Sequence, residues 1–236
     1  PHITIKHLDA VKKHCTGKII YFGVDIHHLR LMREAKLLGK DLQDEIDSSR
    51  SQELTIWENS DYILYPSDEE VEYVHEHFPN KDAIEVPIYF YDENETPEKR
   101  YFEDSSGILF VGNFGHPPNL DAVNWFLDKI LPSIFKSVKD HKFTICGSSI
   151  PIEIERLASD RISILKNVSD EELKNLYLSS RLSVVPLRFG AGVKGKMLES
   201  LFYQIPLVTT RIGTQGIPCI QDCASIADEP EPFVQA

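Results

Sequence analysis

The second half of the chain alternates short apolar segments with amphipathic helical segments, and this alternation constrains the fold more than any other feature. Five near-continuous apolar segments are the predicted strands, at residues 108–111, 143–146, 162–165, 182–185 and 207–210. Four segments with helical spacing separate them, at residues 120–131, 152–158, 171–178 and 196–203. Because near-continuous apolar strands are buried on both faces and strand–helix–strand crossovers are right-handed, the pattern predicts an α/β fold with a doubly wound, Rossmann-like parallel sheet. Ligands of such sheets bind beyond the carboxyl ends of the strands.

The first half shows a second, shorter α/β pattern. Its predicted strands lie at residues 18–23, 62–65 and 83–86, and helical patterns lie between them. Two predicted helices begin with a capping box, one at Ser67 and Glu70 and the other at Ser169 and Glu172. The stretch 91–100 is polar, acidic and without periodicity. We therefore expect a partial amino-terminal domain (1–88), a linker (89–106) and a carboxyl-terminal domain (107–236).

Composition excludes several classes of protein. The 236 residues carry 25 Lys+Arg and 37 Asp+Glu, a formal net charge of −12, which argues against a protein that wraps nucleic acid. Four scattered cysteines do not form a disulfide framework. The sequence contains no signal peptide and no apolar run of about 18 residues. These features predict a cytoplasmic protein with reduced cysteines.

A glycine-rich segment after the fourth strand is the strongest candidate for a ligand site. It spans residues 186–199 and includes glycines at positions 190, 192 and 195. Glycines let backbone N–H groups approach an anion closely. Lys194 and Lys196 stand at the start of the following helix, where the macrodipole disfavours cations, and a bound anion would relieve that conflict. The segment predicts a phosphate site, and the alternative is a solvated loop.

Two general phosphate-binding patterns match this segment incompletely. Residues 190–195 match the dinucleotide fingerprint, which belongs after the first strand of its domain and not after the fourth. That alternative would make the chain an NAD(P)-dependent oxidoreductase, with Arg211 as the one candidate to read a 2′-phosphate. Residues 190–196 match a P-loop, but Met197 replaces the Ser or Thr that holds magnesium.

A third pattern accounts for more of the chain. Lys194-x-Lys196-x-x-Glu199, followed by residues 200–210 and Gly213-x-x-Gly216, resembles the nucleotide-sugar site of group 1 (family 4) glycosyltransferases. The resemblance extends to other segments, at residues 110–114, 118–126, 21–30 and 60–67. Residues 167–173 with Tyr177 resemble the segment that lies beside the base of the nucleotide in this family. It covers about residues 19–218 and is most specific in the carboxyl half.

The resemblance implies the two-domain GT-B architecture and a retaining transferase that needs no metal and no cofactor. It implies transfer of a sugar from a nucleotide-diphosphate donor to a glycan or lipid-linked acceptor in polysaccharide biosynthesis, with peripheral membrane association of the full-length protein. Lys196 would hold the diphosphate and Glu199 both ribose hydroxyls, since a carboxylate offers two acceptor oxygens. The donor-binding set that it implies is Gly112, Asn113, Val168, Arg188, Gly190, Gly192, Val193, Lys194, Lys196 and Glu199.

The family also places a histidine after an amino-terminal strand, where it faces the donor sugar. His27 matches this position and joins Lys196 and Glu199 as an expected catalytic residue; the alternative for His27 is a polar turn that closes the strand. Ala191 stands where the family often carries a second glutamate, and the amino-terminal domain is shorter than the family's. Both departures favour the alternative of a non-catalytic nucleotide-sugar-binding module.

Overall fold

The computed structural model describes residues 1–88, 91, 100–138 and 140–236. The chain folds into two compact units. The first comprises Pro1–Phe90, Phe189–Val193 and Gln215–Pro218, and the second comprises Tyr91–Arg188, Lys194–Thr214 and Cys219–Ala236. Most of the expected linker, residues 89–90 and 92–99, lies outside the described residues. The domain limits at 88 and 107 stay a prediction.

The first unit is built on a three-stranded parallel sheet with the order β1-β2-β3. Its elements are α1 (His2–His14), β1 (Ile20–Phe22), α2 (His27–Leu38), α3 (Gln43–Glu58), β2 (Tyr62–Tyr65), α4 (Asp68–His77) and β3 (Asp82–Glu85). The centre of its core is Trp57 of α3, which is fully buried with Ile63 and Tyr65 of β2. All three strands expected in this half therefore form, with ends shifted by one or two residues.

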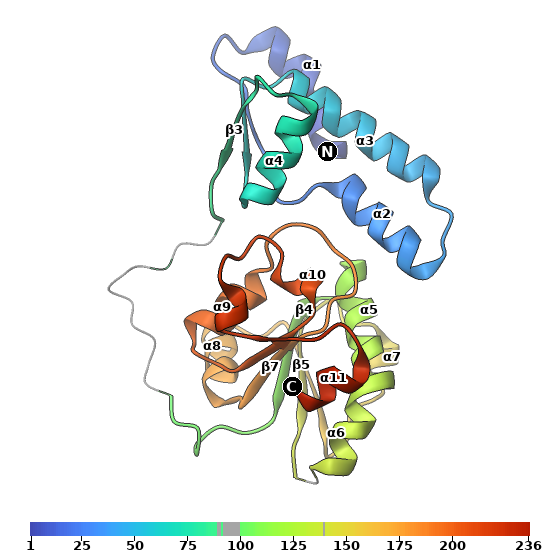
Figure 1. The fold of residues 1–236 in the computed structure, drawn as a ribbon, viewed down its shortest axis with the longest axis vertical. Coiled ribbons are helices and arrows are strands. Elements are labelled where there is room, and N and C mark those ends of the chain that lie inside the picture. The colour runs from blue at the N-terminus through green and yellow to red at the C-terminus, as the bar shows by residue number, and fades with distance from the viewer. Residues whose placement is uncertain (89–90, 92–99, 139) are drawn as a thin grey trace. The chain divides into compact units, whose positions relative to one another are not determined.

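The second unit is a six-stranded parallel sheet with the order β6-β5-β4-β7-β8-β9. Its strands are β4 (Ile108–Asn113), β5 (Phe143–Ser148), β6 (Ile162–Lys166), β7 (Leu182–Val185), β8 (Leu207–Thr209) and β9 (Ser225–Ile226). Its helical elements are α5 (Pro117–Trp125), the π-helical turn η1 (Phe126–Ile130), α6 (Leu131–Ser137), α7 (Ile152–Glu155), α8 (Asp170–Ser179), α9 (Gly195–Phe202), α10 (Arg211–Thr214), the 3₁₀ turn η2 (Ile220–Asp222) and α11 (Pro230–Gln235). Figure 1 shows α8 and α9 on one side of this sheet and α5 and α6 on the other.

The α/β fold class with a Rossmann-like parallel sheet, predicted from the alternating pattern, is confirmed, and all five strands expected in this half form. The sequence pattern missed the edge strand β9 and the helix α11. One expected helix, at residues 120–131, is divided by the π-helical turn η1. The reason is Pro132 in the next turn, because its ring lacks an N–H and clashes with the carbonyl of the preceding turn.

The two predicted capping boxes have different outcomes. In α8 the box forms, because the Ser169 hydroxyl accepts from the Glu172 N–H and the Glu172 carboxylate accepts from the Ser169 N–H. At α4 the prediction is wrong: Ser67 is the N-cap residue but makes no side-chain cap bond, and its hydroxyl donates to the Glu70 carboxylate instead. The Ser169 hydroxyl also donates to its glutamate, so the missing element at α4 is the bond from the backbone N–H to the serine oxygen.

The cap of α8 leads to a testable stability difference. We expect Ser169→Ala to lower the free energy of unfolding of the second unit by about 1 kcal/mol, because the Glu172 N–H loses its acceptor. Urea denaturation followed by circular dichroism measures this change. Ser133→Ala on α6 is the matched control: this exposed serine is not an N-cap residue, and its replacement should change the midpoint little. Equal losses of unfolding free energy for the two substitutions would show that the Ser169 hydroxyl does not stabilise the start of α8.

Candidate functional site

The second unit changes direction between its neighbouring strands β4 and β7. From β4 the chain continues to β5 on one side, and from β7 it continues to β8 on the other. In a doubly wound sheet such a switch point opens a crevice beyond the carboxyl ends of the two strands. Those ends are Asn113 and Val185, and α9 follows β7. The topology therefore places the ends of β4 and β7 and the start of α9 where ligands of this fold class bind.

Lys196, in the first turn of α9, directs its ammonium group to the end of β4. Its Nζ donates to Oδ1 of Asn119 at 2.6 Å and lies 4.7 Å from the centre of the Phe110 ring. A Cβ atom added to Gly112 would lie 3.2 Å from this Nζ, so a glycine at 112 leaves the space that the ammonium uses. Sequence-predicted Gly112 and Lys196 are thus brought together.

Desolvation is the main cause that lowers the pKa of Lys196 to about 7, from an ordinary value of 10.5. The nearby Glu199 opposes this shift and the nearby Lys194 adds to it. A lysine with a lowered pKa beside a second lysine lacks a sufficient counter-charge in the ligand-free chain. An anion at this position would supply it.

The start of α9 carries further positive potential. Its first turn contains no acidic residue, and its N-cap, Lys194, makes no side-chain cap bond. Lys194 is only 8% exposed. The N–H groups of a helix start and two lysines attract the same ligand, a phosphate or another compact anion.

Glu199 lies three residues after Lys196, and residues at this spacing share one helix face. Its Oε2 accepts a hydrogen bond from the hydroxyl of Tyr177 on α8 at 2.7 Å. Burial is the largest cause that raises the pKa of Tyr177 far above its ordinary value, with the Glu199 charge as the second. One face of α9 therefore presents an ammonium for an anion and, one turn further, a carboxylate for hydroxyl groups.

Three further predicted site residues belong to the second unit: Asn113, Val168 and Arg188. Asn113 ends β4, and its carbonyl accepts from the side-chain amide of Asn119 at 2.8 Å. Val168, between β6 and α8, is partly buried and packs against the cluster that contains Tyr177. Arg188 forms a bidentate ion pair with Asp121 of α5, with its Nε 2.9 Å from Oδ2. The structure thus gives Arg188 a partner within the protein, and its role at the donor remains a prediction.

Four of the predicted site residues belong to the first unit: His27, Gly190, Gly192 and Val193. Of these, Gly192 has a backbone φ of 73°, in the left-handed region where a side chain would be strained, which accounts for a glycine at this position. The donor-binding roles of the three loop residues stay predictions.

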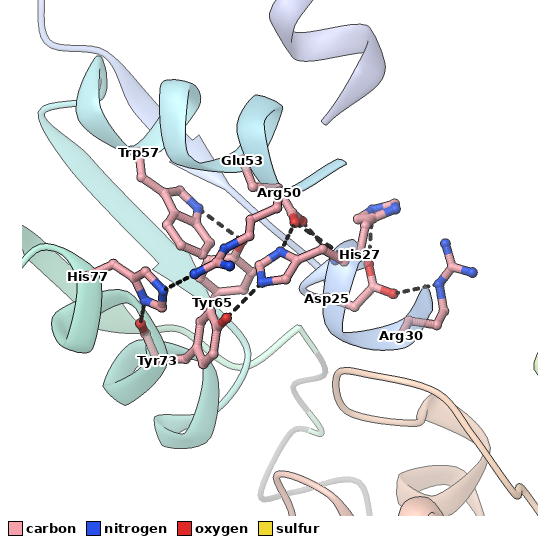
Figure 2. Close-up of polar contacts among 10 residues, drawn as sticks. Asp25, His27, Arg30, Arg50, Glu53, Trp57, Tyr65, Tyr73 and His77 are labelled. Carbon is pink, nitrogen blue, oxygen red and sulfur yellow. Dashed lines mark hydrogen bonds and ion pairs between the residues drawn. The ribbon is translucent and has the colours of Figure 1, made fainter. Parts of the chain in front are cut away.

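His27 begins α2, and the side chains of Asp25 and Arg30 lie beside it (Figure 2). Its Nε2 lies 3.0 Å from an oxygen of Asp25, whose other oxygen lies 3.5 Å from Nε of Arg30. The neighbouring His28 is buried: its Nδ1 lies 2.5 Å from Oε2 of Glu53, and its Nε2 lies 2.8 Å from the Tyr73 hydroxyl. Of the two adjacent histidines, His27 is the partly exposed one.

Glu53 holds the start of α2 from outside that helix. Its carboxylate, 0% exposed, accepts from the backbone N–H of His27 at 2.7 Å and of His28 at 3.2 Å. The N-cap residue Ile26 offers no side-chain acceptor, so Glu53 replaces the cap and also binds the His28 ring. The backbone position of His27 therefore depends on a residue of α3.

Sequence reasoning missed three residues with structural roles at these sites: Asn119, Asp121 and Glu53. A signal existed for Glu53, because it occupies a core-facing position of the helical pattern of α3, where a carboxylate is stable only with partners. Asn119 and Asp121 lie on a helix whose pattern is ordinary, so only the folded structure reveals their partners.

Two kinds of feature are absent from the described part of the chain. There, no group of three or more His, Cys, Asp or Glu side chains is arranged to hold a metal ion. Among the helices formed by these same residues, none has both the length and the apolar composition needed to cross a bilayer.

Comparison with known proteins points to one family. The family model described as "Glycosyl transferases group 1" matches residues 105–236. A protein of Klebsiella pneumoniae described as "Uncharacterized 44.6 kDa protein in cps region" is 35% identical over 116 residues, which are 46% of this chain and 30% of that protein. The chain thus spans about a third of the length of this curated relative.

Solved structures show the same fold at low identity. Sucrose-phosphate synthase from Thermosynechococcus elongatus matches 99% of this chain and 61% of its own, with a TM-score of 0.75 and 14% identity. A UDP-forming α,α-trehalose-phosphate synthase from Burkholderia xenovorans, solved with glucose-6-phosphate, matches 98% of this chain and 62% of its own, with a TM-score of 0.69 and 12% identity. The family model covers more than half of the chain, including all of α9 with Lys196 and Glu199, and the chain therefore belongs to the group 1 glycosyltransferase family.

Proposed function

We propose that the protein containing this chain transfers a sugar from a nucleoside-diphosphate sugar to a glycan or lipid-linked acceptor. The observation that carries the proposal is the pairing on α9 of Lys196, a lysine with a lowered pKa at the end of β4, with the carboxylate of Glu199 one turn later. The first suits a diphosphate and the second suits the two hydroxyls of a ribose.

Charge development gives these residues a catalytic role. When the bond between the anomeric carbon and the diphosphate oxygen breaks, its electron pair stays with the diphosphate, whose negative charge increases. Lys196, Lys194 and the N–H groups at the start of α9 are fixed in advance around that charge, and such preorganised donors lower the barrier. Because these groups can neutralise the leaving diphosphate, we propose a reaction that needs no divalent cation. Retention of configuration and a catalytic role for His27 rest on the family resemblance.

The setting of the reaction is also a proposal. A relative described as lying in a cps region fits a role in polysaccharide biosynthesis, and a structural neighbour is described as UDP-forming, which makes UDP the first nucleotide to test. We propose a cytoplasmic protein that associates peripherally with membranes in its full-length form.

Thermal stabilisation by nucleotides tests the donor site directly. We expect one ribonucleoside diphosphate among UDP, GDP and ADP to raise the melting temperature as its concentration passes its Kd, with or without a chelator, and dTDP, which lacks the 2′-hydroxyl, to require a higher concentration. Glu199→Ala should weaken that binding about tenfold or more, because the ribose hydroxyls lose a charged acceptor. Isothermal titration calorimetry of both proteins measures the two affinities.

A control variant and two alternative binding results test the proposed donor site. Glu171→Ala, an exposed glutamate in the first turn of α8, should leave the affinity unchanged. Stabilisation only by NADP or by ATP with magnesium would contradict the proposal in favour of the other two phosphate-binding patterns. Binding without transfer by a full-length protein would indicate a non-catalytic module.

A further inference from the structure

Tyr177 of α8 is held in one position by its surroundings. Its side chain is 0% exposed and lies in a cluster with Leu109 and Cys146. Its ring stacks on that of Tyr203, with centres 5.3 Å apart and planes at 18°. A tyrosine packed in this way has little freedom to turn, so its hydroxyl oxygen has a fixed place beside α9.

The hydroxyl of Tyr177 acts as a donor to Glu199. A carboxylate has only acceptors, so the 2.7 Å contact to Oε2 requires the tyrosine to supply the proton. Burial raises the pKa of Tyr177, which keeps this proton in place at any ordinary pH. The bond occupies one lone pair of Oε2 and leaves the other lone pair of Oε2 and both lone pairs of Oε1 for other donors.

We propose that Tyr177 is a positioning residue that orients the Glu199 carboxylate for a pair of neighbouring ribose hydroxyls, and so sets the preference for ribonucleotides over 2′-deoxyribonucleotides. This inference rests on the proposed function, because it assumes that Glu199 binds the ribose. A carboxylate on a partly buried glutamate has rotational freedom in its last torsion. With Oε2 held by a rigid donor, the orientation of the carboxylate plane is fixed, and a cis-diol can use both oxygens together.

The packing around Tyr177 supports this role. Val168, the residue expected beside the base, packs against the same buried cluster as Tyr177. The capping box of Ser169 and Glu172 fixes the start of α8, the helix that carries Tyr177. The segment expected beside the base and the orientation of Glu199 therefore share one rigid support.

The test is the discrimination between a ribonucleoside diphosphate and its 2′-deoxy analogue, measured by calorimetry on the whole chain with the nucleotide that stabilises it. In the wild-type protein the ribonucleotide should bind at least about tenfold more tightly than the analogue. Tyr177→Phe removes only the hydroxyl, and we expect it to reduce this ratio to about threefold or less. The affinity for the ribonucleotide should fall more than the affinity for the deoxy analogue. In a Glu199→Gln background, Tyr177→Phe should no longer change the ratio, since the tyrosine acts through the carboxylate.

Matched variants separate positioning from general loss of structure. Tyr203→Phe keeps the stacked ring and removes a neighbouring hydroxyl, and it should leave the ratio unchanged. If Tyr177→Phe does not fold, 3-fluorotyrosine at position 177 replaces it; this more acidic donor should change the ratio, and an unchanged ratio would overturn the inference. Wild-type binding with an unchanged ratio in Tyr177→Phe would overturn the inference alone. Absence of binding by the wild-type chain would overturn both the inference and the proposed function.

Discussion

Replacement of Lys196 by methionine is expected to weaken nucleoside-diphosphate binding by about 100-fold or more, and at the same time to stabilise the ligand-free chain at neutral pH. The loss of affinity follows from the removal of the ammonium at the start of α9. The gain in stability follows from burial: the ammonium is desolvated, which lowers the pKa of Lys196 to about 7, and methionine fills similar space without a charge. Calorimetry and thermal denaturation measure these two opposite effects.

The pH dependence of the wild-type protein follows from the same group. Because the pKa of Lys196 is lowered from 10.5 to about 7, the folded chain binds fewer protons than the unfolded chain between these values. The contribution of Lys196 to stability therefore rises with pH from about 7 towards 10.5. A bound anion raises the pKa of Lys196 again, so nucleotide affinity should be greatest near pH 7 and fall by up to about tenfold per pH unit above it.

Two variants test whether the affinity and its pH dependence come from Lys196. Lys136→Met removes an exposed lysine of α6 and should change neither the affinity nor the pH profile. Lys196→Met should bind weakly at every pH, without the decline above pH 7. A variant that keeps the wild-type affinity would exclude Lys196 from the anion site.

Glu53→Ala is expected to lower the free energy of unfolding of the first unit by about 3–5 kcal/mol, because it leaves several buried groups without their acceptor. These groups are the N–H of His27, the N–H of His28 and the ring nitrogen Nδ1 of His28. Removal of one partner of a buried polar cluster costs far more than removal of an exposed ion pair. The loss should be visible as a lower urea midpoint for this unit.

Trp57 provides a signal for the first unit alone. The chain has two tryptophans, and in a Trp125→Phe background the fluorescence of buried Trp57 follows the core around Glu53. Glu58→Ala, an exposed glutamate at the end of the same helix, should change the free energy of unfolding by less than about 0.5 kcal/mol. Equal midpoints for Glu53→Ala and Glu58→Ala would show that the carboxylate of Glu53 does not hold the start of α2.

Much of the candidate site could be predicted because it depends on local features of the chain. The lysines at the start of α9 and Glu199 one turn later come from a single helix, so their spacing alone predicts a shared face. The same holds for the capping box at Ser169. The box at Ser67 does not form although its spacing is identical: both serines donate to their glutamate, but only Ser169 also accepts from the backbone N–H. The spacing therefore predicts the serine–glutamate contact and not the backbone geometry that completes the cap.

Every strand except the edge strand β9, the α/β fold class and the two charged residues of α9 could be predicted from the sequence, because periodicity and helix electrostatics act over a few residues. The partners of those residues are visible only in the folded chain. Asn119 meets Lys196 across 77 residues of sequence, and Arg188 meets Asp121 across 67. Such pairs form where segments distant in the sequence meet beside one sheet, and burial there makes polar side chains specific partners, since an unpaired group would be costly.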